Sequence, residues 1–265
     1  ERCDVGLKKQ QGIQSVKFEE PPIICAAASV VGQKEGDGPF GDVFDQIESD
    51  PKVGGDTWED AEGRLQERAA ELAIQKAGCG KEAIRYIVAG DLLGQLMASS
   101  FGLAGFDKPL FGVYGACSTM GESIGIGSML VEGGFADYVL AMTSSHFASA
   151  EKQFRFPLGY ANQRPKASTW TVTGSGAVVI CKGDQKQGMA KITGITTGKI
   201  VDYGVKDTMN MGACMAPAAA SVVAAHFKDF GTDPSEYDQI ITGDLGMVGK
   251  DILIDKCSNG QAYYQ

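Results

Sequence analysis

Two stretches of the sequence match each other at a constant offset of 153 residues, and this repeat constrains the fold more than any other feature. The first, residues 71–94, reads ELAIQKAGCGKEAIRYIVAGDLLG, and the second, residues 224–247, reads AAHFKDFGTDPSEYDQIITGDLGM. Gly78 aligns with Gly231 without a gap, and both stretches contain the tripeptide Gly-Asp-Leu. Each pattern is typical of a helix end, a polar loop and a buried strand. The repeat therefore predicts an internal duplication, with two α/β halves related by a pseudo-two-fold axis.

The chain is long and apolar enough to build two such halves around a sizeable core. It has 265 residues, of which 43% are hydrophobic, and its 36 glycines cluster around short apolar runs. This composition favours an α/β protein with many tight turns. We place the N-terminal half at residues 1–183 and a shorter C-terminal half at residues 184–265.

The clearest helical signal covers residues 57–77. Thr57 is the expected N-cap with Asp60 as its acidic N3 partner, and Gly78 is the expected C-cap. Residues 147–171 lack periodicity and are predicted to form a long loop, which in a compact domain is usually functional. Buried strands are predicted at the apolar runs 21–31, 86–89, 138–142 and 172–181, with a further strand within 190–201.

Charge and cysteine usage exclude several classes of function. The net charge of −9 argues against nucleic acid as the main partner and against broad adhesion to anionic lipid. The seven cysteines show no Cys-x-x-Cys spacing, so no metal site is predicted, and their odd number indicates free thiols in a reducing compartment. No apolar run reaches the roughly 20 residues of a membrane helix. The chain also starts without a signal-peptide pattern, so secretion is not expected.

Cys117 is the strongest candidate for a chemically active side chain. It follows the apolar run that ends at Tyr114 and precedes a stretch of small residues, MGESIGIGSM, that is typical of a tightly packed helix. A cysteine at a helix N-terminus has a stabilised thiolate, which suits a nucleophile or a ligand-contacting group. A buried, inert cysteine is the alternative that the sequence leaves open.

Several motifs resemble a known family. The segment GACS before a glycine-rich helix, a strand that ends in TSSH, and TGSGAVVI are similar to the thiolase superfamily. The longer runs resemble the stage V sporulation protein AD family, a thiolase-like group found in endospore-forming bacteria. These runs are AGDLL (89–93), YGACSTMGESI (114–124), EGGFADYVLAMTSSHFASAEKQFRFP (132–157), TVTGSGAVVI (171–180), MGACMAPAAA (211–220) and ITGDLGMVG (241–249).

The resemblance implies a thiolase-like fold with αβαβα layers and a function in sporulation. Members of that family bind dipicolinic acid (pyridine-2,6-dicarboxylate) and act with proteins of a spore membrane channel complex to load it, with calcium, into the developing spore. The implied location is peripheral, on the cytoplasmic side of the spore inner membrane. Thiolase-like proteins are usually dimers, so a homodimer is expected. No cofactor is expected, although calcium can enter with the ligand.

The sequence departs from active thiolases at two places. Such enzymes use a histidine, or a histidine and an asparagine, from the second half to activate the cysteine, whereas residues 242–244 here read Thr-Gly-Asp. His226 lies in the helix of the repeat, where a catalytic role is not expected, so Cys117 lacks its usual general base. Residues 254–265 also depart from the family pattern, and the second half is therefore expected to be incomplete.

The segment 147–171 has the composition of a site for an aromatic dianion. Between residues 151 and 170, four basic side chains face Glu151 alone, and aromatic residues are interleaved with them. Arginine forks suit carboxylates and an aromatic ring suits stacking, although a solvated basic loop is the plain alternative. The predicted ligand-binding residues are Cys117, His146, Phe154, Arg155, Arg164 and Asp244.

Other roles remain open for some of these side chains. His146 follows the TSS turn and is either a carboxylate partner or a satisfied core histidine. Asp91 and Asp244 end equivalent strands, and we expect Asp91 to cap a helix and Asp244 to face the pocket. The leading hypothesis is a non-enzymatic dipicolinate-binding protein. The alternatives are acyl transfer with Cys117 as the nucleophile, and a scaffold in a spore membrane complex.

Overall fold

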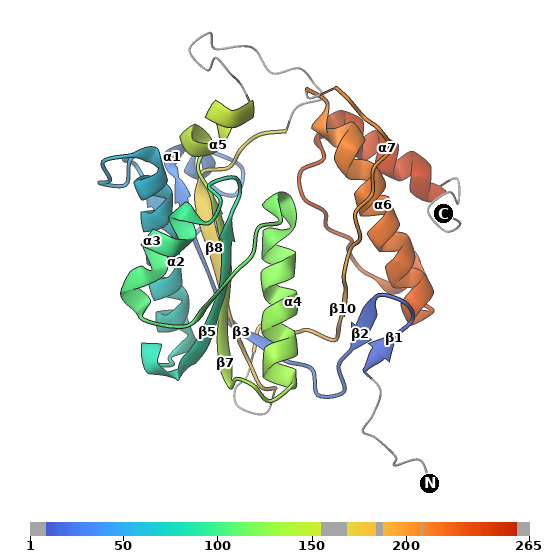
Figure 1. Cartoon of the computed structure of the whole chain (residues 1–265), viewed down its shortest axis with the longest axis horizontal. Coiled ribbons are helices and arrows are strands. Elements are labelled where there is room, and N and C mark those ends of the chain that lie inside the picture. The colour runs from blue at the N-terminus through green and yellow to red at the C-terminus, as the bar shows by residue number, and fades with distance from the viewer. Residues whose placement is uncertain (1–8, 155–168, 184–187, 208, 259–265) are drawn as a thin grey trace. The chain divides into compact units, whose positions relative to one another are not determined.

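The protein is described by a computed structural model that covers residues 9–154, 169–183, 188–207 and 209–258 (Figure 1). The chain divides into two compact units, each built from several segments. Unit 1 comprises Glu1–Glu19, Asn162–Trp170 and Thr193–Gln265, and unit 2 comprises Glu20–Ala161 and Thr171–Ile192. The N-terminal segment therefore belongs to the same unit as the C-terminal segment. The boundary predicted from the sequence lies instead between residues 183 and 184.

Unit 2 contains the main sheet and the helices that cover it. Its strands are β3 (Ile23–Gly32), β4 (Gln46–Glu48), β5 (Ile84–Asp91), β6 (Leu110–Gly112), β7 (Tyr138–Ser145), β8 (Gly174–Cys181) and β9 (Ala190–Lys191). Its α-helices are α1 (Gln33–Gly36), α2 (Trp58–Ala77), α3 (Met97–Leu103), α4 (Thr119–Glu132) and α5 (Phe147–Phe154). Its short 3-10 turns are η1 (Gly41–Val43), η2 (Lys81–Ala83), η3 (Ala104–Phe106) and η4 (Ala116–Ser118).

The main sheet is mixed, and its strand order is β4-β3-β8-β7-β5-β6, with β9 paired to β3 outside this path. β5 runs parallel to β6 and β7, whereas β8 runs antiparallel to β3 and β7. Gly174 at the start of β8 pairs with both Val31 and Ser145, and Asp91 pairs with Ser144. The carboxyl ends of β3, β5 and β7 therefore meet at one edge of the sheet, where α/β sheets usually bind ligands.

Alternate residues of β7 belong to two different cores. Leu140 and Met142 pack in the core that α2 forms with the sheet, whereas Val139 and Ala141 pack in the core on the side of α4. Figure 1 shows α4 on the opposite face of the sheet from α2 and α3. Because both faces are covered, β7 and β8 read as nearly continuous apolar runs in the sequence.

Helix α2 begins and ends as its sequence predicts. The Thr57 side chain accepts a hydrogen bond from the Asp60 amide, and Gly78 adopts a left-handed conformation with φ of 59°. Helix α2 packs closely against α3 at the point where Gly63 of α2 meets Gly102 of α3. A Cβ atom at Gly102 would overlap the carbonyl oxygen of Gly63, so only glycine fits at this crossing.

Unit 1 has a small antiparallel sheet and two main helices. Its elements are β1 (Gln10–Gln11), β2 (Ser15–Lys17), β10 (Gly194–Thr196), α6 (Met211–Phe230), η6 (Pro234–Glu236) and α7 (Gly246–Ser258). The sheet order is β1-β2-β10. Asp229 of α6 holds the turn between β1 and β2, because its carboxylate accepts from the amides of Ile13 and Gln14, each at 3.0 Å.

The structure confirms the helical part of the repeat to the residue. The bounds of α6 and of η6 lie 153 residues after those of α2 and η2. Asn210 caps α6 as Thr57 caps α2, and Gly231 ends it in a left-handed conformation with φ of 65°. The duplication therefore extends back to the N-caps of both helices, which lie outside the stretches that match in sequence.

The second copy of the repeated strand is not formed, so that prediction was wrong. β5 lies between β6 and β7, but the matching residues 237–244 pair with no strand in the described part of the chain. Ile240 and Ile241 are 52% and 84% exposed. A strand needs a neighbour to satisfy its backbone, so the apolar pattern alone does not make one.

The long loop predicted at 147–171 is also partly corrected. It begins with the helix α5, and eight residues are too few to show a clear helical period in the sequence. Residues 155–168 lie outside the described part of the chain. The strands predicted at 21–31, 86–89, 138–142 and 172–181 are present as β3, β5, β7 and β8, each with somewhat different bounds.

The glycine contact between α2 and α3 gives a first prediction. Gly102→Ala should lower the free energy of unfolding by about 1–3 kcal/mol, because the added methyl group forces the two helices apart. Gly105→Ala is the matched control, since nothing lies within 4 Å of a Cβ atom at that position. Urea unfolding of the two variants measures this, and equal stabilities would contradict the close crossing.

Candidate functional site

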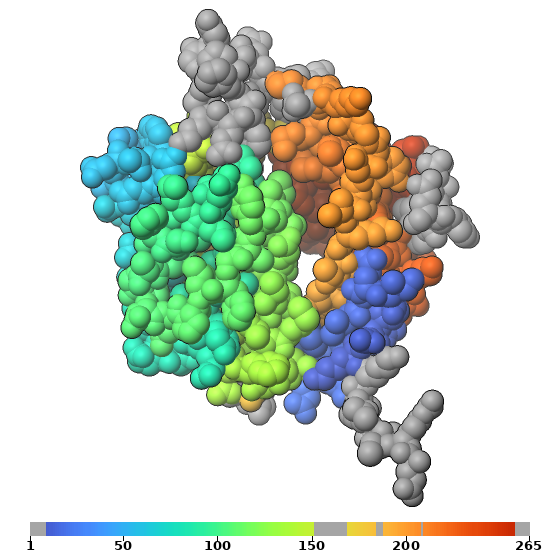
Figure 2. All heavy atoms as spheres, viewed as in Figure 1, coloured from blue at the N-terminus to red at the C-terminus, as the bar shows by residue number. Residues whose placement is uncertain are grey.

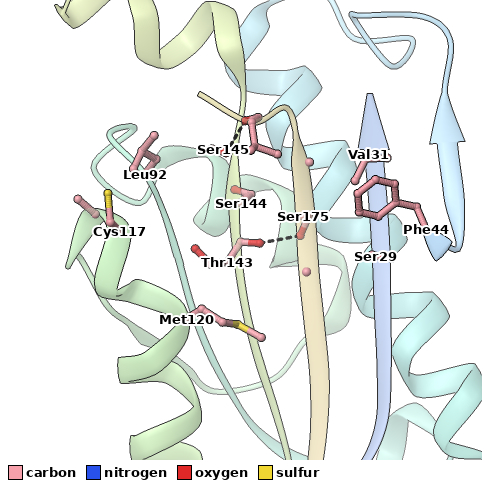
Figure 3. Close-up of a pocket in the computed structure, with 14 residues that line it drawn as sticks. Ser29, Val31, Phe44, Leu92, Cys117, Met120, Thr143, Ser144, Ser145 and Ser175 are labelled. Atoms are coloured by element: carbon pink, nitrogen blue, oxygen red, sulfur yellow. Dashed lines mark hydrogen bonds between the residues drawn. The ribbon is translucent and has the colours of Figure 1, made fainter. Parts of the chain in front are cut away.

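A cavity of about 330 Å³ lies where β3, β5 and β7 reach the edge of the main sheet (Figure 3). The residues that line it all belong to unit 2. They come from β3, β7 and β8, from the turn after β5, from η4 and α4, and from the segments before β4 and β8. In Figure 3, Cys117 and Leu92 lie on one side, and Val31 and Phe44 lie on the other.

Among the described residues, no charged side chain lines the cavity. Ser29, Thr143 and Ser145 bring hydroxyl groups, while Phe44 and Met120 bring apolar surface. Thr143 and Ser145 alternate along β7 with residues of the α2 core, so their side chains point to the face that α4 covers. Such a wall binds a flat ring by apolar contact and a carboxylate by neutral hydrogen-bond donors.

Cys117 lies at the start of a helix, as the sequence predicts. It is the central residue of η4, which runs directly into α4, and it is exposed at the cavity. The first amide groups of a helix have no partners within the helix, and together with the helix dipole they attract negative charge. The thiol and the N-terminus of α4 therefore face the same space.

The backbone before Cys117 is strained. Ala116 has φ of 48°, a left-handed conformation that is rare for a residue with a side chain. Gly115 precedes it, and a Cβ atom there would collide with the carboxylate of Glu122. This turn directs Cys117 into the cavity, and strain of this kind is concentrated at functional sites.

The turn after β5 forms another part of the cavity wall, and Asp91 holds it in place. The buried carboxylate of Asp91 accepts from the Leu96 amide at 3.3 Å and from the Ser99 hydroxyl at 3.1 Å. The Leu92 amide donates to the carbonyl oxygen of Ser144 at 3.0 Å. Asp91 also accepts from the Ser99 amide at 3.4 Å, so it binds the first turn of α3 as predicted, although the N-cap residue of that helix is Leu96.

On the α2 side of β7 lies a polar cluster that the sequence did not indicate. Glu62 is 2% exposed, and its carboxylate accepts from Ser144 Oγ at 2.9 Å and from Ser149 Oγ at 2.6 Å. The amide nitrogen of Gln66 donates to Ser144 Oγ at 2.6 Å and to Ser99 Oγ at 3.0 Å. We call the six buried side chains Glu62, Gln66, Asp91, Ser99, Ser144 and Ser149 the Glu62 cluster.

Burial raises the pKa of Glu62 to about 7, and the nearby charge of Asp91 adds to this effect. The hydrogen bonds from Ser149 and Ser144 oppose the increase but do not cancel it. A carboxylic acid that titrates near neutral pH and is buried behind a cavity is typical of functional sites.

His146 is buried beside the site, but its ring nitrogens have other partners. Nε2 lies 2.8 Å from the carbonyl oxygen of Pro51, and the Ala148 amide donates to Nδ1 at 3.1 Å. This pairing requires the neutral ring with its proton on Nε2, and burial lowers the pKa of His146 accordingly. His146 is not among the residues that line the cavity, so its position gives its predicted role in ligand binding no support.

Of the other four predicted ligand residues, three have side chains that the structure does not describe, and the fourth belongs to unit 1. Arg155 and Arg164 lie outside the described residues, and Phe154 ends α5 with its side chain undescribed. Asp244 belongs to unit 1, where its carboxylate accepts from the Gly246 amide at 2.8 Å at the start of α7. Of the three predicted residues whose side chains the structure describes, Cys117 lines the cavity and His146 and Asp244 do not. The ligand-binding roles of all six residues stay predictions.

Sequence reasoning missed the residues that shape the cavity opposite Cys117. Phe44 lies in a turn-rich segment far from Cys117 in the sequence, and Thr143 and Ser145 belong to a strand that was expected to end at Met142. Glu62 and Gln66 are four residues apart on α2 and lie beside its apolar stripe. No local pattern indicated that the helix face next to that stripe would be buried.

The strain at Ala116 gives a second prediction. Ala116→Gly should raise the free energy of unfolding by about 1 kcal/mol, because glycine adopts a positive φ without steric cost. Ala104→Gly should lower it by a similar amount, since Ala104 has an ordinary helical φ of −56°. Thermal unfolding of the two variants measures these changes, and melting temperatures that shift in the same direction would contradict the strained turn.

Comparison with known proteins agrees with this geometry. The family model described as stage V sporulation protein AD (SpoVAD) matches residues 12–263. The chain is 44% identical over 247 residues to stage V sporulation protein AD of Bacillus subtilis (strain 168), which covers 93% of this chain and 72% of that relative.

Solved structures of condensing enzymes share the fold at low sequence identity. A variant of OleA from Xanthomonas campestris matches with a TM-score of 0.60 at 14% identity, over 95% of this chain and 83% of the other. The 3-oxoacyl-(acyl carrier protein) synthase III of Xanthomonas oryzae pv. oryzae matches with a TM-score of 0.54 at 15% identity, over 93% and 82%. These likenesses show a thiolase-like α/β fold, and the sequence matches show that the chain belongs to the stage V sporulation protein AD family.

Proposed function

We propose that the protein binds dipicolinic acid, or its calcium chelate, without catalysing a reaction, and serves its uptake into the developing spore. Membership of a sporulation protein family supports the biological setting. The observation that carries the ligand assignment is the cavity at the N-terminus of α4, whose described wall combines hydroxyl groups with apolar side chains.

The cavity suits a small, flat, aromatic diacid. Its volume of about 330 Å³ lies at the lower end of the range for small-molecule sites. Phe44 and Met120 offer surface for a pyridine ring, while the hydroxyls and the start of α4 offer donors for carboxylates. The calcium chelate of the dianion carries no net charge, so the uncharged side chains of the described wall suit the chelate better than the free dianion.

The alternative of acyl transfer needs a base beside Cys117, and the chain has only two histidines. The ring nitrogens of His146 are engaged by Pro51 and Ala148. Those of His226 lie 2.8 Å from Thr196 Oγ1 and 2.7 Å from Tyr237 Oη. These contacts support a cavity that binds and does not react.

The proposed location is the cytoplasmic side of the spore inner membrane, where the protein would act beside membrane proteins of a channel complex. None of the helices described here is long and apolar enough to cross a bilayer. We propose peripheral attachment through those partners, as the family resemblance implies.

Isothermal titration with dipicolinate, with and without calcium, tests the proposed function directly. We expect saturable binding that calcium strengthens, no competition by acetyl-CoA, and largely unchanged affinity in Cys117→Ser. Phe44→Ala should weaken binding by about tenfold through loss of ring contact. Phe40→Ala is the matched control, because Phe40 is 66% exposed and does not line the cavity.

Other outcomes of this titration point elsewhere. Binding of acetyl-CoA without dipicolinate would favour the acyl-transfer alternative and make acylation of Cys117 the next measurement. No binding of either ligand would leave the scaffold role.

A homodimer is the second part of the proposal, and the open edge of the main sheet supports it. β6 is the last strand of the sheet and pairs with β5 on one side. Phe111 in this strand is 44% exposed, and Phe101 in the neighbouring α3 is 79% exposed. The segment 97–112, teal to green in Figure 2, contributes to the visible surface of unit 2. Edge strands with apolar neighbours tend to pair with another chain, and a two-fold axis would join two β6 edges.

Light scattering of the purified chain tests the dimer. Phe101→Asp should shift the protein to monomer and raise the dimer dissociation constant by more than tenfold, because it places a charge in an apolar contact. Phe135→Asp is the control, since Phe135 is 66% exposed but follows α4, away from β6 in the chain. A Phe101→Asp dimer as tight as the original would exclude this edge.

A further inference from the structure

The Glu62 cluster combines two carboxylates with no basic side chain. Glu62 and Asp91 are 2% and 0% exposed, and their cluster partners are three serines and one glutamine. Buried charges are usually paired, because an unpaired one is costly to desolvate. The cluster is therefore less costly when one of its carboxyl groups is neutral.

Hydrogen-bond counting identifies where the proton belongs. The amide nitrogen of Gln66 donates within the cluster, but its Oε1 is buried without a donor among the described residues. Gln66 follows Glu62 by four residues on α2, so the two side chains lie on the same face of the helix. An ionised Glu62 can only accept hydrogen bonds, whereas a protonated Glu62 adds one donor to a cluster that has an acceptor without a partner among the described residues.

The groups around Glu62 favour the same neutral state. Asp91 on β5 and Glu59 on α2 are acidic, and both raise the pKa of Glu62, which burial already brings to about 7. α3 contributes no titratable side chain. Between β7 and α5, His146 is held in its neutral form by its contacts with Pro51 and Ala148.

The remaining titratable groups of the packed strands lie at the other end of the sheet. Tyr138 on β7 pairs with Cys181 on β8, and Cys25 on β3 is close to them. Ser144, the cluster residue of β7, lies at the opposite end of that strand. No described cation therefore stabilises an ionised Glu62 from the sheet side.

The cluster touches the cavity wall at two points. Ser144 donates to Glu62 through its side chain, while its backbone carbonyl accepts from the Leu92 amide of the wall. Asp91 belongs to the cluster and holds the turn that carries Leu92. Repulsion between ionised Glu62 and Asp91 would loosen both contacts.

We infer that Glu62 is a positioning residue that carries a proton in the binding form of the cavity, so that ligand binding is coupled to proton uptake. This inference rests on the proposed binding of dipicolinate. Glu62 does not itself line the cavity. It acts on the cavity wall through Ser144, which lines the cavity, and through Asp91, which holds the turn that carries Leu92.

The same proton links stability to pH. The pKa of Glu62 is raised in the folded state from 4.5 to about 7, so the folded protein binds this proton more tightly than the unfolded chain. Its contribution to stability is complete below the unfolded value and is lost as the pH rises through about 7. The Glu62 carboxyl therefore makes the protein less stable in weak alkali than in weak acid.

Dipicolinate titrations from about pH 5.5 to about pH 8.5, where both ligand carboxyl groups are ionised, test the coupling. The affinity of the unaltered chain should fall above pH 7, by up to about tenfold per pH unit. Glu62→Gln, whose amide donates as the neutral acid does, should keep the acid-side affinity throughout. Glu67→Gln, an exposed carboxylate on the same helix, should follow the unaltered chain.

Two further measurements keep the test decisive. If Glu62→Gln does not fold, titration of the unaltered chain at about pH 7.5 in buffers of different ionisation enthalpy should show uptake of up to one proton. Binding without proton uptake, or parallel pH profiles for the unaltered chain and Glu62→Gln, would overturn the inference.

Failure of the proposed function would give a different result. The unaltered chain would then bind no dipicolinate at any pH, and urea unfolding would decide whether Glu62 carries the proton. If the free energy of unfolding falls between weak acid and weak alkali in the unaltered chain but not in Glu62→Gln, the result would support a proton on Glu62 in the folded protein. An equal change of stability with pH in the two proteins would show that Glu62 does not carry the proton.

Discussion

The central pairing of β7 with β5 and β8 is the constraint on which the rest of unit 2 depends. It separates the α2 core from the α4 core by simple alternation along one strand, and it brings the carboxyl ends of three strands to one edge. The last residues of β7 then serve two roles, because Thr143 and Ser145 face the cavity and Ser144 faces Glu62. A one-residue shift in register would exchange these faces and would remove the cavity and the cluster together.

The cavity and the cluster are built on a fold that this chain shares with solved structures such as OleA and 3-oxoacyl-(acyl carrier protein) synthase III. The fold places a cysteine at a helix N-terminus, and the strained turn at Ala116 directs it into the cavity. Around that thiol the wall is built from hydroxyl and apolar side chains, and the two histidines bond elsewhere. Fold likeness alone assigns no activity, since chemistry depends on the groups beside the thiol.

Two carboxyl groups are buried in the Glu62 cluster, and their burial is costly because charged groups lose their hydration. Serine and glutamine partners satisfy most of the oxygen atoms, but they bring no positive charge. Burial without a positive partner therefore favours the neutral form of Glu62, and perturbed groups of this kind are concentrated at functional sites. Under the proposed coupling, the contacts of the cluster with the wall that carries Leu92 would make binding depend on pH.

The sequence by itself determined those features that depend on neighbours along the chain. The caps of α2 at Thr57 and Gly78, the helix that starts after Cys117, and the strands at the apolar runs all follow from local hydrogen bonding and burial patterns. The repeat predicted the duplication, and the matched bounds of α2 and α6 confirm its helical part. The motifs were enough to identify the family.

Only the tertiary structure decided which of these side chains meet. Phe44 reaches the cavity and His146 turns to Pro51 because of contacts between segments far apart in the sequence, which no local pattern encodes. Residues 237–244 have the apolar pattern of β5 but lack paired neighbours, so they form no strand. Glu62 looks like a surface residue of a helix, and only the packing of α2 against β7 buries it and raises its pKa. Local order thus follows from the chain itself, whereas burial and partnership, which decide the chemistry, arise only when distant segments pack together.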